Sequence, residues 1–295
     1  MKITEVECLI LDGTFPFVRV YTDEGIVGIG ECFRRQPRVT KTIIDDVLQH
    51  VLIGTDPLDT EVRWQDMARA GWGVELGGAI FCAMAGLDIA MWDIKGKALG
   101  MPIWKLLGGK VRDSIRMYAS SMCRDLTPVE EARRAVSFAE QGYSAYKLHS
   151  AVPGKIDDPA DETVETVREV RAAVGDDIEI LVDVNGAYSV HHSIEIGKKL
   201  EALGVFHFEE PRYFTDLEGL AQVADALTIP IASGEMIFHT HQYRDLILRG
   251  KVDILQPDIV KVPGFTEMQR ISALAAAFNK PITVHNIQPT ISTVA

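Results

Sequence analysis

The sequence predicts an α/β protein in which a (β/α) barrel follows a smaller N-terminal α+β domain. From Val111 onward, short apolar segments typical of strands alternate with longer amphipathic segments typical of helices. Seven such strands follow one another, which favours a barrel over an open parallel sheet. Before Val111 the pattern differs, because strands joined by a hairpin come first and helices follow. We therefore expect one domain over residues 1–112 and a second over residues 113–295.

The N-terminal domain is predicted to begin with strands over residues 3–11 and 17–32. The second segment is interrupted by Asp23-Glu24-Gly25, a combination typical of a tight hairpin turn. Helices are predicted over residues 40–52, 60–70 and 77–99. The segment "LGMPIWKLLGG" then ends the helical pattern with glycine and proline.

The barrel domain alternates strands with helices throughout. Strands are predicted at 114–120, 145–150, 178–186, 205–211, 230–235, 253–258 and 281–286. Helices are predicted at 128–142, 159–175, 189–204, 216–227, 239–250 and 266–279. No G-x-G-x-x-G sequence follows any of these strands, so the pattern does not indicate a dinucleotide-binding site.

Composition narrows the possible partners. The 295 residues carry a formal net charge of −12, and no run of lysine and arginine exceeds two residues, which argues against a nucleic-acid surface. The sequence begins without a basic and apolar leader, and no apolar segment is long enough to span a bilayer, so a cytoplasmic protein without membrane contact is expected. The four cysteines form no C-x-x-C pair and are expected to be reduced core thiols.

Ionisable residues stand at the C-terminal ends of the predicted barrel strands, where the chemistry of such barrels takes place. In chain order these ends carry Lys147 and His149, Asp183 and Asn185, Glu209 and Glu210, Glu235, Asp258, and His285. Ordinary loop polarity explains one or two such ends. Six in succession, each directly after an apolar run, indicate a site.

Three carboxylates on consecutive strand ends, Asp183, Glu209 and Glu235, would repel one another unless a cation lies among them. An all-oxygen donor set without cysteine or histidine is typical of Mg²⁺ and makes zinc the weaker hypothesis. Asp258 and His285 follow on the next two strands, and a carboxylate bonded to an imidazole suits a general base. A cation beside a base indicates abstraction of a proton next to a substrate carboxylate.

The adjacent acids of "HFEEP" are predicted to play different parts. Side chains alternate between the two faces of a strand, so His207 and Glu209 share one face while Phe208 and Glu210 share the other. Only one glutamate can then face the barrel mouth. We expect Glu209 to be the metal ligand and Glu210 to stabilise the strand end.

Several motifs occur in order, one after another along the chain: "GIVGIGEC", "GLDIAMWDIKGKALGMPIWKLLGG", "DVNGAYS", "FEEP", "SGE", "QPDIVKVPG" and "VHN". Together they resemble the enolase superfamily, in the mandelate racemase subgroup and its acid-sugar dehydratase branch. The resemblance implies a capping domain and a modified TIM barrel. It also implies a homo-oligomer that acts on a small sugar acid.

The resemblance assigns a role to each residue. It implies that Asp183, Glu209 and Glu235 bind Mg²⁺ and that Lys147, His149, Asp258 and His285 form the catalytic set, with Lys147, Asn185 and Lys261 near the substrate. The reaction implied is dehydration of an aldonate or aldarate. The proton α to the carboxylate is removed, the enediolate loses the β-hydroxyl, and a 2-keto-3-deoxy acid results.

Two departures from the family pattern keep alternatives open. His149 stands where racemases of the family have a second lysine, which favours a dehydratase over a racemase, epimerase or cycloisomerase. The chain also ends at Ala295, before the family's eighth strand, so we expect a barrel that is incomplete at its C-terminus through truncation of the record. A catalytically inactive metal-binding homologue is the remaining alternative.

Overall fold

The computed structural model describes residues 1–71, 77–288 and 290–295. The described chain forms two compact units that interleave along the sequence. Unit 1 comprises Met1–Asp113, Glu235–Tyr243 and Gln256–Ala295, and unit 2 comprises Ser114–Gly234 and Arg244–Leu255. The domain division expected at residue 112 stays a prediction, since these units follow contacts rather than chain order.

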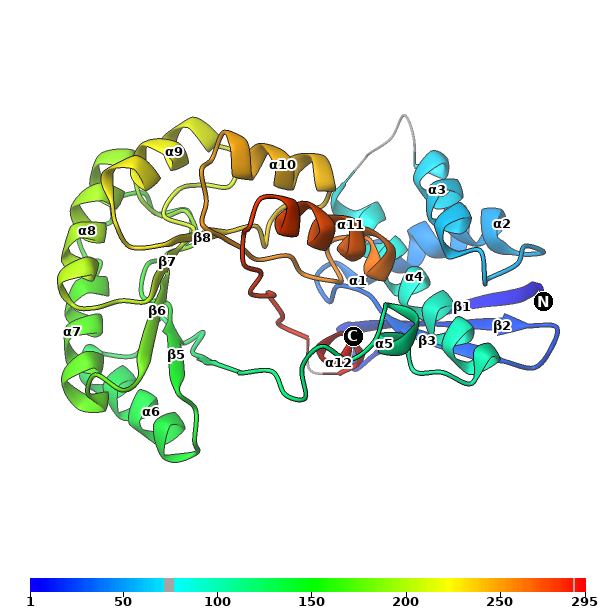
Figure 1. The fold of residues 1–295 in the computed structure, drawn as a ribbon, viewed down its shortest axis with the longest axis horizontal. Coiled ribbons are helices and arrows are strands. Elements are labelled where there is room, and N and C mark those ends of the chain that lie inside the picture. The colour runs from blue at the N-terminus through cyan, green and yellow to red at the C-terminus, as the bar shows by residue number, and fades with distance from the viewer. Residues whose placement is uncertain (72–76, 289) are drawn as a thin grey trace. The chain divides into compact units, whose positions relative to one another are not determined.

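Unit 1 contains a three-stranded antiparallel sheet formed by β1 (Ile3–Leu11), β2 (Phe15–Thr22) and β3 (Val27–Glu31), in the order β1-β2-β3 (Figure 1). The predicted hairpin joins β2 to β3, where the Gly25 amide donates to the Thr22 carbonyl at 3.1 Å. Along β2 buried residues alternate with more exposed ones, as expected for a sheet with one face on a core.

The longest helix of unit 1, α4 (Gly78–Leu99), packs against β3. Glycines allow the close approach. A Cβ atom at Gly28 would lie 2.1 Å from the Ala90 carbonyl oxygen, and one at Gly30 would lie 1.9 Å from that of Gly86. The other helical segments of unit 1 are α1 (Pro37–Ile43), the π-helical η1 (Ile44–Leu48), α2 (Gln49–Leu52), α3 (Thr60–Ala70), α5 (Ile103–Leu106), α11 (Gly264–Ala277) and α12 (Ile291–Val294).

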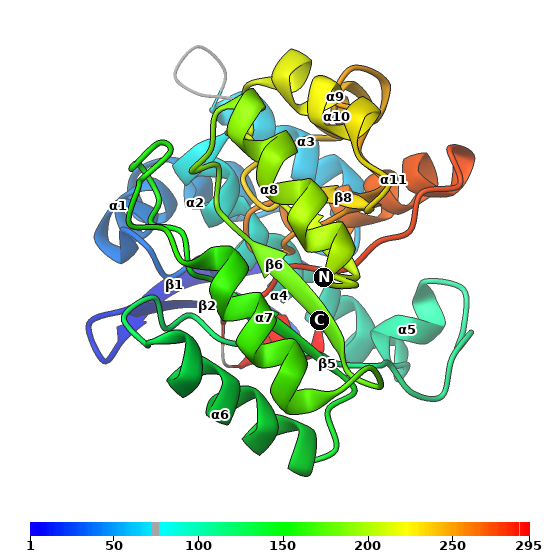
Figure 2. The same ribbon diagram turned by 90° about the vertical axis from the view of Figure 1, so that its left-hand side faces the viewer.

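Unit 2 is built on a parallel sheet whose six strands pair in chain order. They are β4 (Ala119–Ser120), β5 (Ala145–Leu148), β6 (Glu179–Asp183), β7 (His207–Glu209), β8 (Ile231–Ser233) and β9 (Ile254–Leu255). The helices that alternate with them are α6 (Pro128–Glu140), α7 (Thr163–Val174), α8 (Val190–Ala202), α9 (Leu217–Ala226) and α10 (Thr240–Leu248), the last beginning in unit 1 residues. Helices α6, α7 and α8 lie in a row beside β5 and β6 (Figure 2). Parallel order with intervening helices places every strand's C-terminal end at the same edge of the sheet.

The predicted fold class, a (β/α) barrel type of chain with an N-terminal α+β part, is confirmed by these elements. The predicted strand at 281–286 is wrong: within the described residues this segment has only an isolated bridge, at Ile282. A strand exists only where a ladder of hydrogen bonds continues, and Val284 in this segment is 57% exposed. Among the described residues, no helix combines the length and apolar character that crossing a bilayer requires.

Candidate active site

Two buried carboxylates lie side by side at the C-terminal edge of the unit 2 sheet. Asp183 is the last residue of β6 and Glu209 the last residue of β7, and the two are paired in the parallel register. Both are almost completely buried. Because buried carboxylates are costly unless a positive group lies beside them, this edge requires a cation.

Lys147 supplies positive charge within unit 2. Its ammonium lies 2.8 Å from both carboxylate oxygens of Glu209 and 3.7 Å from Oδ2 of Asp183. Burial opposes ionisation of Glu209, but the charge of Lys147 and the nearby His207 ring outweigh it and hold the pKa of Glu209 well below its usual range. Burial and the Glu209 charge raise the pKa of Asp183. Although burial alone would lower the pKa of Lys147, the Glu209 charge raises it, so this ammonium stays protonated.

His149 and Asn185 hold the Asp183 carboxylate from two sides. Nε2 of His149 lies 2.9 Å from Oδ2 of Asp183, while Nδ1 of the same ring contacts the Ser121 carbonyl oxygen. The backbone amide of Asn185 donates to Oδ1 of Asp183 at 2.8 Å, and its side-chain amide donates to Oδ2 at 3.1 Å. Both ring nitrogens of His149 are therefore engaged by oxygen atoms.

Two residues at this edge were not predicted from the sequence. Nε2 of buried His207 lies 3.5 Å from Oε2 of Glu209, a contact that their shared strand face could have indicated. Arg124 donates to the Asn185 side-chain oxygen and to the Ala151 carbonyl oxygen, the latter at 2.9 Å. Arg124 follows β4, whose end carries no acid, so the strand-end pattern gave no signal for it.

The alternation used to separate Glu209 from Glu210 ends at Glu209. Glu210 lies beyond the last residue of β7 and adopts a left-handed backbone conformation with φ of 42°. Its amide donates to the Ala232 carbonyl at 2.9 Å, and its carbonyl accepts from the Gly186 amide at 2.8 Å. The backbone of Glu210 thus links the neighbouring strand ends, and the predicted difference in function between the two glutamates stays a prediction.

Unit 1 brings together the predicted base and two carboxylates. Nδ1 of His285 lies 2.7 Å from Oδ2 of Asp258, and Nε2 lies 2.8 Å from Oε2 of Glu235. Burial alone would lower the pKa of His285, but the hydrogen bonds to Asp258 and Glu235 outweigh it and raise the pKa to about 9. The imidazole is therefore a cation between two carboxylates at neutral pH.

Lys261 lies beside Glu235 in the same unit. Its ammonium is 3.7 Å from Oε1 of Glu235, 3.6 Å from the Met236 sulfur and 5.1 Å from the centre of the Phe33 ring. Phe33 follows β3, so the N-terminal sheet contributes to the surroundings of Glu235. Sequence reasoning gave Lys261 a supporting position but missed Phe33, because an aromatic residue in a loop carries no chemical signature.

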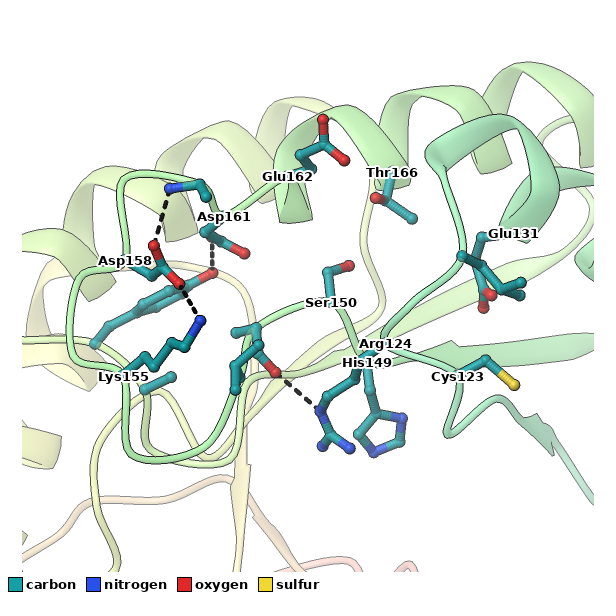
Figure 3. A pocket seen from close by; sticks show the side chains of 16 residues that line it. Cys123, Arg124, Glu131, His149, Ser150, Lys155, Asp158, Asp161, Glu162 and Thr166 are labelled. Atoms are coloured by element: carbon teal, nitrogen blue, oxygen red, sulfur yellow. Dashed lines mark hydrogen bonds and ion pairs between the residues drawn. The ribbon is translucent and has the colours of Figure 1, made fainter.

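A cavity of about 190 Å³ opens behind His149 within unit 2. Figure 3 shows it with Arg124 beside His149, and with Glu162 and Thr166, which belong to the N-terminal end of α7, above Ser150. Its walls carry more acidic than basic side chains, so the cavity does not resemble an anion site.

His239 directly precedes α10, and its ring packs on aromatic side chains. The ring centre lies 5.7 Å from that of Phe81 and 6.2 Å from that of Trp64. Burial lowers the pKa of His239, although the charge of Glu267 partly offsets this. The ring therefore belongs to an aromatic cluster of unit 1.

The residues that could hold a metal are all oxygen donors. Asp183 and Glu209 of unit 2 and Glu235 of unit 1 are buried, and each offers a carboxylate oxygen that could bind a metal ion. The position of Lys147 on Glu209 and Asp183 shows that positive charge is accommodated at this edge. An all-carboxylate donor set fits Mg²⁺ better than zinc or copper.

Comparison with known proteins gives consistent results for both parts of the chain. Residues 10–108 match the family described as "Mandelate racemase / muconate lactonizing enzyme, N-terminal domain", and residues 129–295 match "Enolase C-terminal domain-like". A D-galactonate dehydratase of Verminephrobacter eiseniae is 35% identical over 291 residues, which cover 97% of this chain and 75% of that protein.

Solved structures agree. A crystal structure of an enolase superfamily member from Salmonella Typhimurium matches with a TM-score of 0.90 at 32% identity, covering 99% of this chain and 82% of that one. The 3,6-anhydro-D-galactonate cycloisomerase from Zobellia galactanivorans matches with a TM-score of 0.88 at 31% identity and covers the same shares.

Proposed function

Since the chain belongs to the enolase superfamily, in its mandelate racemase and muconate lactonizing branch, we propose that it is an Mg²⁺-dependent dehydratase of a sugar acid. The curated relatives are hydro-lyases by name, and we assign this enzyme to the same reaction class. The proposed substrate is an aldonate or aldarate, a small molecule with a carboxylate and neighbouring hydroxyl groups. A homo-oligomer stays a prediction.

We assign the metal to Asp183, Glu209 and Glu235. The support is their burial, their oxygen chemistry and their place in the chain, since Asp183 and Glu209 end β6 and β7 and Glu235 comes two residues after β8. Mg²⁺ at these carboxylates would supply positive charge beside the enediolate that forms when the α-proton leaves. His149 and Asn185 orient the Asp183 carboxylate, as partners of metal ligands commonly do.

His285 is the proposed base. Asp258 accepts a hydrogen bond from Nδ1 and fixes the orientation of the ring. Nε2 faces Glu235, a proposed metal ligand, and takes the α-proton in the deprotonated form of the ring. The C–H bond at the α-carbon breaks, and its electron pair forms a double bond to the carboxylate carbon while the carbonyl pair moves to oxygen. As the carboxylate re-forms, that pair becomes the double bond between the α- and β-carbons. The β-hydroxyl leaves as water with the proton that His285 took up, and the enol product tautomerises to the 2-keto-3-deoxy acid.

The observation that carries this proposal is the single complete base. Nδ1 of His285 is oriented by the Asp258 carboxylate, whereas Nδ1 of His149 contacts a backbone carbonyl oxygen and the Lys147 ammonium is bound by Glu209. A racemase needs a competent base on each face of the α-carbon. The arrangement therefore supports dehydration, which needs only one such base.

The test is a panel of aldonic and aldaric acids incubated with the protein and Mg²⁺, with 2-keto acid formation and exchange of the α-hydrogen in ²H₂O measured together. We expect at least one acid to give a 2-keto acid, and chelation of Mg²⁺ to stop it. Exchange without 2-keto product would favour a racemase, epimerase or cycloisomerase. Metal binding without exchange on any acid would favour an inactive homologue.

A further inference from the structure

The last residue of β3, Glu31, meets the segment that follows His285 within unit 1. Glu31 is fully buried, and its Oε1 accepts a hydrogen bond from the Gln288 side-chain amide at 3.1 Å. Its Oε2 accepts from the backbone amide of Ser292 at 2.8 Å. The Gln288 amide also donates to the Cys32 carbonyl at 2.8 Å. One buried carboxylate thus receives donors from two places in the C-terminal segment (Figure 1 shows α12 beside β3).

Glu31 stands on a rigid support. Gly28 and Gly30 of β3 pack so closely on α4 that any Cβ atom there would overlap a carbonyl oxygen of the helix. A Cβ atom at Gly86 of α4 would in turn lie 2.3 Å from the Cys32 sulfur. The end of β3 is therefore fixed against a long buried helix, and rigid elements hold functional groups more precisely than loops do.

The segment that carries His285 has little support of its own. It is not a strand, and the His285 amide donates at 3.0 Å to the carbonyl oxygen of Pro257, next to Asp258. Beyond His285, Asn286 accepts from the Gln288 amide at 2.8 Å, so the turn from 286 to 288 is closed on itself. The Asn286 side chain also donates to Thr293 Oγ1 at 2.6 Å, and Gln288, three residues after His285, makes the hydrogen bond to Glu31 of β3.

We propose that Glu31 is a positioning residue for His285, acting through its hydrogen bonds to Gln288 and Ser292. The N-terminal sheet then sets the position of the His285 side chain within unit 1. The role of His285 as the base rests on the proposed function. The positioning of the segment that carries His285 does not depend on it. Because a displacement of 1 Å in a catalytic group can cost about 100-fold in rate, even a small release of this segment should be measurable.

The experiment compares Glu31→Gln with Gln288→Met, which remove the same contact from opposite sides. In Glu31→Gln the new amide group faces a donor, either the Gln288 amide or the Ser292 amide. Glu5→Gln, an exposed position on β1 of the same sheet, is the control. The readouts are hydrogen exchange of the backbone over residues 285–288, Mg²⁺ affinity, and kcat and KM on the acid identified by the panel.

Both variants are expected to exchange amides 285–288 at least about tenfold faster than the parent and to lower kcat by roughly 10- to 100-fold, with KM and Mg²⁺ affinity unchanged. The control should match the parent. Unchanged exchange over 285–288 in either folded variant would overturn the proposal, as would equal losses of kcat and Mg²⁺ affinity, which indicate a general structural role. If no acid reacts even with the parent protein, the proposed function fails while the exchange measurement still decides the positioning.

Discussion

The two acidic clusters of this chain solve the same electrostatic problem with different cations. In unit 2, Asp183 and Glu209 lie around the Lys147 ammonium, and in unit 1, Glu235 and Asp258 lie around the His285 imidazole. Neighbouring carboxylates hold the pKa of Lys147 above its usual value, so that charge is permanent, whereas the pKa of His285 is about 9 and its proton can exchange. A permanent cation stabilises a fixed arrangement of carboxylates. A titratable one can also transfer a proton.

The largest expected effect comes from removing the titratable cation. His285→Asn should lower kcat by about 10²–10⁴-fold, the range for loss of a general base, while Mg²⁺ still binds. Turnover of the acid from the panel and calorimetric titration of Mg²⁺ give the two readings. The same substitution at exposed His191 is the control. Full activity in His285→Asn would remove the Asp258–His285 pair from the mechanism.

The next largest effect concerns the carboxylates around Lys147, Asp183 and Glu209. Glu209→Gln should weaken Mg²⁺ binding by more than about 100-fold, because a charged metal ligand is lost. Loss of a residue that only orients a metal ligand typically costs about 10- to 100-fold. Glu210→Gln, the adjacent matched variant, should weaken it by less than about tenfold and mainly reduce the free energy of unfolding. Calorimetry on both variants measures the difference. Equal losses of Mg²⁺ affinity would contradict the assignment of Glu209 alone.

The smallest effect is a pH dependence of the free energy of unfolding, which we expect from His285 and its partners Glu235 and Asp258. His285 has a pKa of 6.5 when unperturbed and about 9 in the metal-free fold, so its charge stabilises the folded state fully below pH 6.5 and this stabilisation is lost as the pH rises through 9. The shift corresponds to about 3 kcal/mol at most.

Denaturant unfolding of chelator-treated protein between pH 6 and 9.5 measures this loss. His285→Asn should lack it, and Lys147→Met should retain it, since Lys147 stays charged over the whole window. A parent protein and a His285→Asn variant with the same pH slope would show that the imidazole charge does not stabilise the fold.

The sequence predicted the parts of the fold whose burial pattern is regular. The alternation in β2 and the continuous burial of β5 match the two kinds of sheet, one covered on a single face and one covered on both. The segment 281–286 has the same apolar character as these strands but lacks a ladder in the described residues. Composition and length cannot distinguish the two cases, because strand formation depends on a partner elsewhere in the chain.

Some residues of the candidate site could likewise be placed from the sequence pattern, and others could not. Polar residues that directly follow a strand, such as Asp183 and Glu209, could be placed at one edge from the sequence, because parallel strands bring their C-terminal ends together. The contact between Glu31 and Gln288 joins residues 257 positions apart and follows from no periodic pattern. Lys147 was placed at this edge from the sequence, and its role near the substrate stays a prediction, while its contact with Glu209 was not predicted.

The glycine contacts between β3 and α4 have a consequence for how this sequence can vary. Gly28 and Gly30 face the helix, while Ile29 between them is exposed. Substitutions can therefore accumulate at Ile29, whereas any larger residue at either glycine would have to separate the strand from the helix. In a library of random variants, β3 should retain Gly28, Gly30 and Glu31, while Ile29 diversifies. The retained glycines would then mark the contact surface between β3 and α4, which is formed by backbone atoms.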